Sequence, residues 1–289
     1  METLNLRELE QLNTLRLNIR RSMSQGEGLR RSSAKGRSAE FSGYREYVPG
    51  DDTRYVDWNA YARFDKLYIK EFMEEKEGRV SIYLDTSKSM DFGEKKKSTL
   101  MAELAEIISF SATSGRDSVY VTDLAFPTNT FKVPVGSLGV ATLKAWLEKT
   151  EVNGKIDLMS SLKKAVKGRG GVAIVISDFM DEGFLAKETD ILRLFDYHGM
   201  KTTLIHVLSR EEMEIEDDGS FQYIDSEDED REVRITLDKY SIRDYKKALE
   251  DYSKNIYTKA KAAGGNYILC STADPIKKLI YENLRFLFL

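Results

Sequence analysis

Residues 79–93 have the sequence RVSIYLDTSKSMDFG, in which an alternating apolar run stops at a group of oxygen-bearing side chains. Apolar residues occupy every second position of residues 80–84, a pattern typical of a buried β-strand. Asp85, Ser87 and Ser89 follow it. Loops at the carboxyl ends of strands face the ligand site in open α/β sheets, and hard oxygen donors suit Mg²⁺ or Mn²⁺ better than zinc. Asp and Ser also fill ordinary turns, so a plain turn is the alternative.

Predicted strands and helices alternate from residue 80 to the C-terminus, which indicates a doubly wound α/β fold. Residues 172–176 (VAIVI) are apolar at every position, as in the middle of a mostly parallel sheet with helices on both faces. Helices are expected at residues 95–114, 138–149, 158–166, 185–197 and 240–263, and further strands at residues 119–124, 131–133, 202–208 and 266–270.

Three segments divide the chain. We expect residues 1–40 to form an N-terminal helix and a basic linker, which is either a connector or an arm for an acidic partner. Residues 41–78 form a small predicted β appendage, and residues 79–289 the α/β domain. Opposite charges among residues 45–63 favour a structural ion-pair network, with a partner-binding face as the alternative. An acidic hairpin insertion near residues 211–238 is expected to be a solvated loop that protects a sheet edge.

Composition excludes several classes of protein. The 289-residue chain carries 44 Lys and Arg against 48 Asp and Glu, which gives no strong attraction for nucleic acid or an anionic membrane. The single cysteine, Cys270, excludes an internal disulfide, and His198 and His206 lack a zinc-type spacing. The charged N-terminal stretch differs from a secretory signal, and no apolar run approaches the roughly 20 residues of a membrane helix. We expect a soluble, cytoplasmic protein without membrane insertion.

A second carboxylate is predicted near the first. Asp178 follows the fully apolar strand, so it and Asp85 are expected at the same edge of the sheet. With the loop of residues 153–157, this arrangement resembles the von Willebrand factor type A (vWA) domain and its metal-ion-dependent adhesion site. The resemblance implies that Ser87 and Ser89 bind Mg²⁺ directly, while Asp85 and Asp178 act largely through water, which Mg²⁺ commonly retains.

One position departs from the vWA pattern. Ile156 stands where that site has a ligating Thr, and an isoleucine side chain has no ligand atom. Asp157, turned inward, is the alternative source of a ligand. We therefore predict a weak Mg²⁺ or Mn²⁺ site formed by Asp85, Ser87, Ser89, Asp157 and Asp178.

A more specific resemblance includes the N-terminal part of the chain. It rests on EFSGYREYVPGDDTRYVDWNAYAR, LYIKEF, DTSKSMDFG, VISDF and HVLSREE, which begin at residues 40, 67, 85, 175 and 206. These stretches are similar to the bacterial vWA-like family called domain of unknown function 58 (DUF58), and the signature from Pro49 to Trp58 is specific to it. The resemblance implies a partner, a MoxR-type AAA+ ATPase, and a role in chaperone-like or assembly work.

Three functions compete. A non-enzymatic binding module would accept a partner's carboxylate at the metal. A haloacid-dehalogenase-like phosphotransfer enzyme would use Asp85 as its nucleophile, but it needs an acid two residues later, where Ser87 stands. An ATPase would need a P-loop, whose spacing is absent from residues 93–99. The lysines at 95–97 are expected in a solvated first helical turn; the alternative is that they rim the metal crevice and attract an acidic partner. The binding module is the predicted function, and no enzymatic activity is expected.

Overall fold

The computed structural model describes residues 39–74, 78–152, 154–181, 184–215, 219–224 and 232–287. The described residues fall into two units, one of residues 39–74 and one made of the described residues from 78 to 287. The helix and linker expected over residues 1–40 lie outside the described residues, apart from residues 39 and 40.

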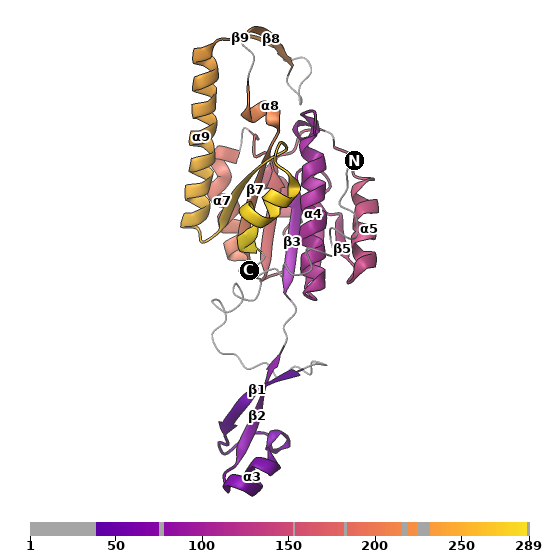
Figure 1. Cartoon of the computed structure of the whole chain (residues 1–289), viewed down its shortest axis with the longest axis vertical. Coiled ribbons are helices and arrows are strands. Elements are labelled where there is room, and N and C mark those ends of the chain that lie inside the picture. Colours follow the sequence, from indigo (N-terminus) through magenta and orange to yellow (C-terminus); the bar gives the residue numbers. More distant parts are fainter. Residues whose placement is uncertain are drawn as a thin grey trace. The chain divides into compact units, whose positions relative to one another are not determined.

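A six-stranded sheet forms the middle of the larger unit (Figure 1). Its strands lie in the order β10-β7-β6-β3-β4-β5, and neighbours are parallel except for β4 with β5. This is a doubly wound order with β3 and β6 adjacent at its centre, so the predicted fold class is confirmed. The strands are β3 (Arg79–Leu84), β4 (Ser118–Asp123), β5 (Thr130–Val133), β6 (Val172–Ser177), β7 (Lys201–Leu208) and β10 (Asn266–Ser271).

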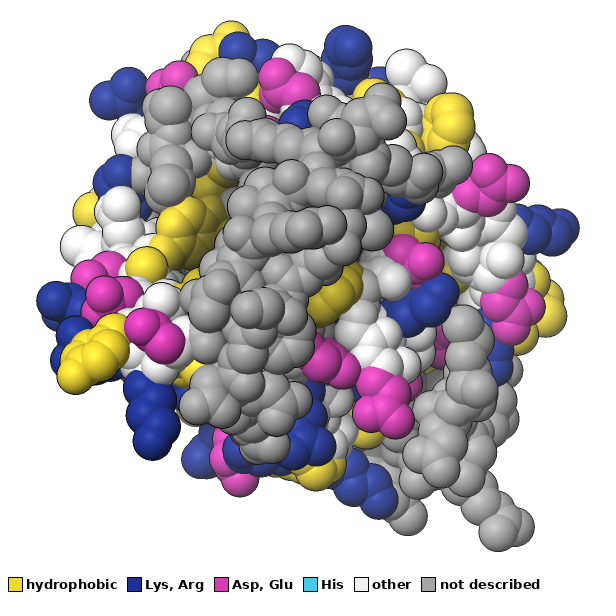
Figure 2. Space-filling view, turned by 90° about the horizontal axis from the view of Figure 1, so that it is seen from above, with side chains coloured by type: hydrophobic (Ala, Val, Ile, Leu, Met, Phe, Trp, Pro, Cys, Tyr) yellow, Lys and Arg dark blue, Asp and Glu magenta, His cyan; other side chains and the backbone are white. Residues whose placement is uncertain are grey.

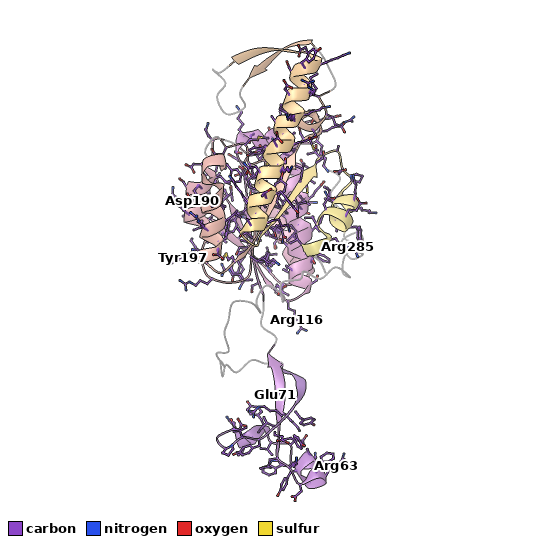
Figure 3. All side chains as sticks on the ribbon, turned by 90° about the vertical axis from the view of Figure 1, so that its left-hand side faces the viewer. Arg63, Glu71, Arg116, Asp190, Tyr197 and Arg285 are labelled. Carbon is purple, nitrogen blue, oxygen red and sulfur yellow. The ribbon has the colours of Figure 1, made fainter. Side chains whose placement is uncertain are left out.

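Helices cover both faces of this sheet and enclose two apolar cores. One core lies under α4 (Lys97–Ser114), α5 (Ser137–Leu147) and the C-terminal turns that begin with α10 (Ile276–Lys278). The other lies under α6 (Leu158–Ala165), α7 (Phe184–Tyr197) and α9 (Lys239–Ala262). Outward-facing side chains of α7, such as Asp190 and Tyr197, are solvent-exposed (Figure 3).

The central strand β6 explains why the sheet is buried on both sides. Successive side chains of a strand point to opposite faces, so Ile174 enters one core while Ala173 and Val175 enter the other. All six residues of β6 are buried. Burial of each large aliphatic side chain contributes about 1.5–3 kcal/mol, which anchors the strand between the two helical layers.

The smaller unit is a two-stranded antiparallel sheet with a short helix. β1 (Ala39–Glu46) pairs with β2 (Tyr68–Glu74), and η2 (Thr53–Tyr55) and α3 (Trp58–Phe64) lie between them in the chain. Arg45 binds Asp51 at 2.5 Å, and Asp57 accepts a hydrogen bond from the Tyr44 hydroxyl at 2.8 Å. Arg45 also pairs with Glu71 at 3.1 Å, and Arg54 pairs with Asp52 at 2.5 Å, so the appendage contains ion pairs of the predicted kind. The hydrophobic pattern did not predict α3, which Asp57 caps through the Asn59 amide.

The insertion after β7 begins with α8 (Arg210–Met213) and continues into β8 (Gly219–Ile224) and β9 (Glu232–Leu237), an antiparallel pair. The predicted acidic tip, residues 225–230, lies outside the described residues. Seen from above, the described side chains of both charge signs are interspersed (Figure 2). Within the part of the chain that the structure describes, no helix has the length and apolarity to cross a membrane.

The double-sided burial of β6 leads to a first prediction. Ile174→Ala should lower the free energy of unfolding by about 2–5 kcal/mol, because Ile174 is fully buried and its loss leaves a cavity. Leu138, which is 70% exposed on α5, gives the matched control, since Leu138→Ala should change stability by no more than about 0.5 kcal/mol. Chemical denaturation of both variants provides the measurement, and equal losses would contradict the assignment of β6 to the core.

Candidate functional site

Three adjacent strands end at buried carboxylates. Asp85 follows β3, Asp178 follows β6 and Asp123 ends β4. β3 and β6 pair in parallel, with Leu84 opposite Ile176, so the first two acids emerge at the centre of the sheet. The helices after β3 and β6 belong to opposite faces, which is the switch point where ligands bind in open α/β sheets.

Asp85 is held by hydrogen bonds at both carboxylate oxygens. Its Oδ1 accepts from the Ser87 backbone N–H at 3.0 Å, and its Oδ2 accepts from the Ser177 hydroxyl at 2.5 Å. Asp85 is only 6% exposed. Burial, and then the negative charge of Asp178, raises the pKa of Asp85 to about 6.

The two serines of the motif lie next to each other. Ser87 and Ser89 place their Oγ atoms 3.0 Å apart at the start of η3 (Lys88–Asp91). The Lys88 backbone N–H donates to the Gly154 carbonyl at 2.9 Å, which joins this loop to the loop before α6. Two of the three predicted loops are therefore tied together through the backbone.

Asp178 pairs with a lysine from the first turn of α4. Lys97 Nζ lies 2.8 Å from Asp178 Oδ2 and 2.7 Å from Glu212 Oε1, and the Lys97 side chain is 1% exposed. Burial favours a higher pKa for Asp178, but the charge and hydrogen bond of Lys97 outweigh it and lower that pKa. Burial likewise opposes the charge of Lys97, but the two carboxylates outweigh it and raise the lysine pKa.

The sequence prediction of a solvated first turn is wrong for Lys97. Lys95 pairs with Glu103 and Lys96 pairs with Asp91, both with partly exposed lysine side chains. Cations are unfavourable at a helix N-terminus, and α4 has no side-chain cap there. The buried pairing of Lys97 with two carboxylates offsets that cost.

Ile156, which stands where the vWA pattern has a ligating Thr, packs into the core and offers no ligand atom. Ile156 is 8% exposed and belongs to the core under α6. Asp157 is exposed and caps α6 by accepting from the Ser160 backbone N–H at 2.8 Å. Its role as a metal ligand stays a prediction, and Asn153 of the same loop lies outside the described residues.

Sequence reasoning missed Glu212, Ser177 and Asp123, which accepts from the Thr86 hydroxyl at 2.5 Å. It placed Lys97 in a solvated first turn or at the rim of the site, whereas the side chain lies buried between two carboxylates. We call Asp85, Ser87, Ser89, Asp178, Lys97 and Glu212 the strand-tip cluster. A helical phase signal could have found Lys97, because Leu100 and Met101, three and four residues later, are buried on the same face of α4.

The donor set of the strand-tip cluster agrees in type with the implied metal. Carboxylate and hydroxyl oxygens are the ligands that Mg²⁺ and Mn²⁺ prefer. Within the described ranges, no group of three or more His, Cys, Asp and Glu side chains could hold a metal ion. A metal here would therefore depend on the two serine hydroxyls, and it would compete with the hydrogen bonds and the ion pair already made by Asp85 and Asp178.

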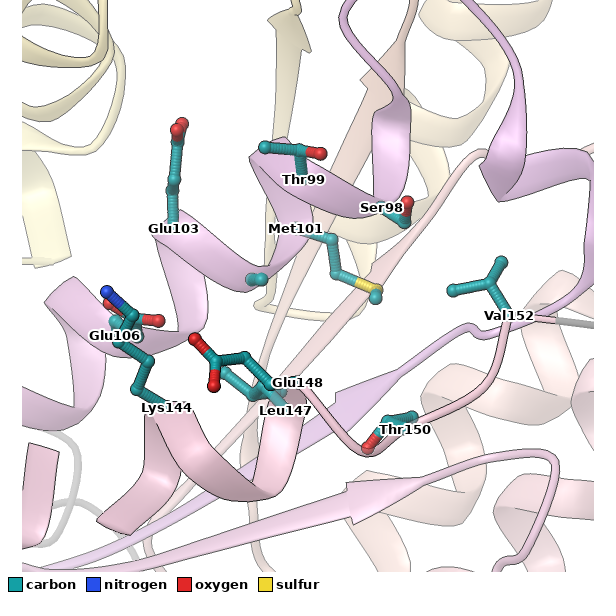
Figure 4. A pocket seen from close by; sticks show the side chains of 11 residues that line it. Ser98, Thr99, Met101, Glu103, Glu106, Lys144, Leu147, Glu148, Thr150 and Val152 are labelled. Atoms are coloured by element: carbon teal, nitrogen blue, oxygen red, sulfur yellow. The ribbon is translucent and has the colours of Figure 1, made fainter. Parts of the chain in front are cut away.

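A pocket of about 160 Å³ lies elsewhere, between α4 and α5 (Figure 4). Glu106 and Lys144 line it together with Glu103 and Glu148. Burial raises the pKa of Glu106 to about 7, and the charges of Glu103 and Glu148 act in the same direction while Lys144 opposes them. None of its lining residues belongs to the strand-tip cluster.

The ion pair of Lys97 predicts a large effect on stability. Lys97→Met should lower the free energy of unfolding by about 3–5 kcal/mol, because it leaves the buried Asp178 without its partner. Lys96→Met, which removes a half-exposed pair with Asp91, should cost no more than about 1 kcal/mol. Urea denaturation of the two variants checks this, and similar costs would show that burial does not distinguish the two lysines.

Glu106 predicts a specific dependence of stability on pH. Its pKa rises from 4.5 to about 7 on folding, so the folded state binds more protons between these values and stability falls as pH rises through them. Glu106→Gln should make the decrease in the free energy of unfolding between these pH values smaller by about 1–3 kcal/mol. The exposed Glu151→Gln is the control and should keep the wild-type profile. Unfolding free energies across this pH range give the test; an unchanged slope in Glu106→Gln would refute the assignment.

Comparison with known proteins adds a family. The family model described as protein of unknown function DUF58 matches residues 43–255. Uncharacterized protein Rv1480 of Mycobacterium tuberculosis and uncharacterized protein Mb1516 of Mycobacterium bovis are each 27% identical to this chain over 149 residues. These alignments cover 47% of this chain, and the chain spans only 45% of the length of these relatives.

Two solved structures show weaker likeness. BatB, a conserved hypothetical protein from Bacteroides thetaiotaomicron, aligns with 72% of this chain and 97% of its own, at 16% identity and a TM-score of 0.44. The pilus adhesin SpaC from Lactobacillus rhamnosus GG aligns with 82% of this chain and 30% of its own, at 13% identity and a TM-score of 0.25.

Proposed function

Because the chain belongs to the DUF58 family, whose function is unknown, we propose that it is a non-enzymatic protein-binding module that acts with a MoxR-type AAA+ ATPase. Its binding face is the end of the sheet at the strand-tip cluster, with a weak Mg²⁺ or Mn²⁺ site at Asp85, Ser87, Ser89 and Asp178. The supporting observation is the convergence of these oxygen donors at the switch point of a doubly wound sheet.

The surroundings of Asp85 favour binding over catalysis. A nucleophilic carboxylate must be within reach of its substrate, whereas Asp85 is only 6% exposed and each of its oxygens already accepts a hydrogen bond. The position two residues later holds Ser87, whose hydroxyl lies beside that of Ser89 rather than providing an acid. These contacts argue against the phosphotransfer alternative.

The choice of partner rests on the family resemblance. DUF58 proteins resemble one another in a signature that spans Pro49 to Trp58, and the family is associated with MoxR-type ATPases in chaperone-like or assembly work. A metal at the strand-tip cluster would bind a carboxylate of that partner in its open position. Lys88 and Lys95 follow Asp85 closely in the chain and would steer an acidic group toward it.

A second docking face is favoured by a separate observation. The smaller unit exposes large apolar side chains within the signature region and α3, including Trp58 at 61% and Phe64 at 66%. Exposed aromatic residues of this kind are enriched at protein interfaces. The same partner could therefore be held by the smaller unit instead of by the sheet.

The affinity of variants for the MoxR-type ATPase of the same genome distinguishes the two candidate docking faces, the strand-tip cluster and the smaller unit. Asp85→Asn should weaken binding about tenfold or more in the presence of Mg²⁺, whereas Trp58→Ala should leave it unchanged. Titration calorimetry on variants shown to be folded by circular dichroism gives the affinities. Loss of binding in Trp58→Ala with none in Asp85→Asn would move the interface to the smaller unit. Phosphate-ester turnover that Asp85→Asn abolishes would instead favour the enzyme.

A further inference from the structure

We propose that Lys97 is the resident cation of the strand-tip cluster, and that a divalent cation binds there only by displacing Lys97 Nζ from Asp178. This inference rests on the metal site of the proposed function and names what controls it. It follows from the place of Lys97, whose ammonium group lies between two carboxylates and away from solvent.

The first argument is geometric. Lys97 Nζ is 2.8 Å from Asp178 Oδ2, and the Met180 backbone N–H lies 3.1 Å from the other carboxylate oxygen. Both oxygens of Asp178 are thus engaged. A metal acting on Asp178, directly or through a water, would bring a second cation close to the ammonium group on the same carboxylate. The repulsion between the two cations favours departure of the ammonium group from Oδ2 when the metal binds.

The second argument concerns charge. The strand-tip cluster contains three carboxylates, Asp85, Asp178 and Glu212, against the single ammonium of Lys97. Buried carboxylates need a compensating cation, because isolation from water penalises the charged form. Lys97 supplies that compensation from within the chain, and a divalent ion would supply more of it. Either cation satisfies Asp178, which makes them competitors.

The third argument identifies where Lys97 would go. Glu212 Oε1 already holds Nζ at 2.7 Å, and the Glu212 side chain is 19% exposed while that of Asp178 is 3% exposed. Glu212 is itself fixed, because its Oε2 accepts from the Ser209 backbone N–H at 2.7 Å in a capping box. A flexible lysine side chain can therefore leave Asp178 and keep Glu212 as its partner.

The neighbouring lysines provide a matched control. Lys96 Nζ pairs with Asp91 at 2.5 Å on the surface, and its side chain is 52% exposed. Lys96→Met removes the same charge from the adjacent residue but leaves the pairing of Asp178 intact. It therefore corrects for any general effect of net charge on cation binding.

The test is calorimetric titration of wild type, Lys97→Met and Lys96→Met with MgCl₂ and with MnCl₂ at constant ionic strength. Lys97→Met should bind the divalent cation about tenfold more tightly than wild type, because its competitor is gone, and Lys96→Met should match wild type. Mg²⁺ should also raise the melting temperature of Lys97→Met more than that of wild type.

Each other outcome counts against the proposal. Equal affinities in wild type and Lys97→Met would overturn the competition while leaving the metal site in place. No binding by any variant would overturn both this inference and the metal site. If Lys97→Met does not fold, Lys97→Gln replaces it, since glutamine is neutral but can still donate a hydrogen bond to Asp178; the same affinities then decide the matter.

Discussion

The buried ion pair between Lys97 and Asp178 connects the parts of the larger unit that carry its candidate site. Lys97 begins α4 on one face of the sheet, whereas Asp178 follows the central strand β6. A charge held at 1% exposure is tolerable only with a partner of opposite sign in hydrogen-bonding contact. The start of α4, the end of β6 and the capping box of α8 are therefore positioned by one shared electrostatic requirement.

The fold and part of the site could be predicted from the sequence for definite reasons. A strand that is apolar at consecutive positions, such as β6, is typical of a parallel sheet covered by helices on both faces. Parallel strands bring their carboxyl ends to the same edge of the sheet. The proximity of the loops carrying Asp85 and Asp178 follows from those two facts. Strand periodicity cannot show which side chain supplies the opposing charge, because Lys97 belongs to a helix. Which of three consecutive lysines is buried there depends on which face of the helix each one occupies.

The loop before α6 shows a different limit. Ile156 marks a departure from the vWA pattern that is visible in the sequence, but only the structure shows its side chain in the core under α6. Asp157 then serves as a helix cap, a role that Asp fills in many proteins and that sequence alone does not distinguish from a ligand. The loop nonetheless reaches the strand-tip cluster through its backbone, since Gly154 accepts from the Lys88 amide.

The insertion after β7 is joined to the same cluster by two consecutive glutamates. Glu211 Oε1 accepts from the Glu94 backbone N–H at 2.8 Å, and Glu212 binds Lys97 while completing the capping box of α8. Both contacts join α8, from which the chain continues to β8 and β9, to the segment between β3 and α4. Any change in the pairing of Lys97 therefore affects Glu212, which also caps α8 at the start of the insertion. The strand-tip cluster and α8 are therefore linked through Lys97, which binds both Asp178 and Glu212. A partner that alters the charge balance at Asp178 would also change the contacts that hold α8.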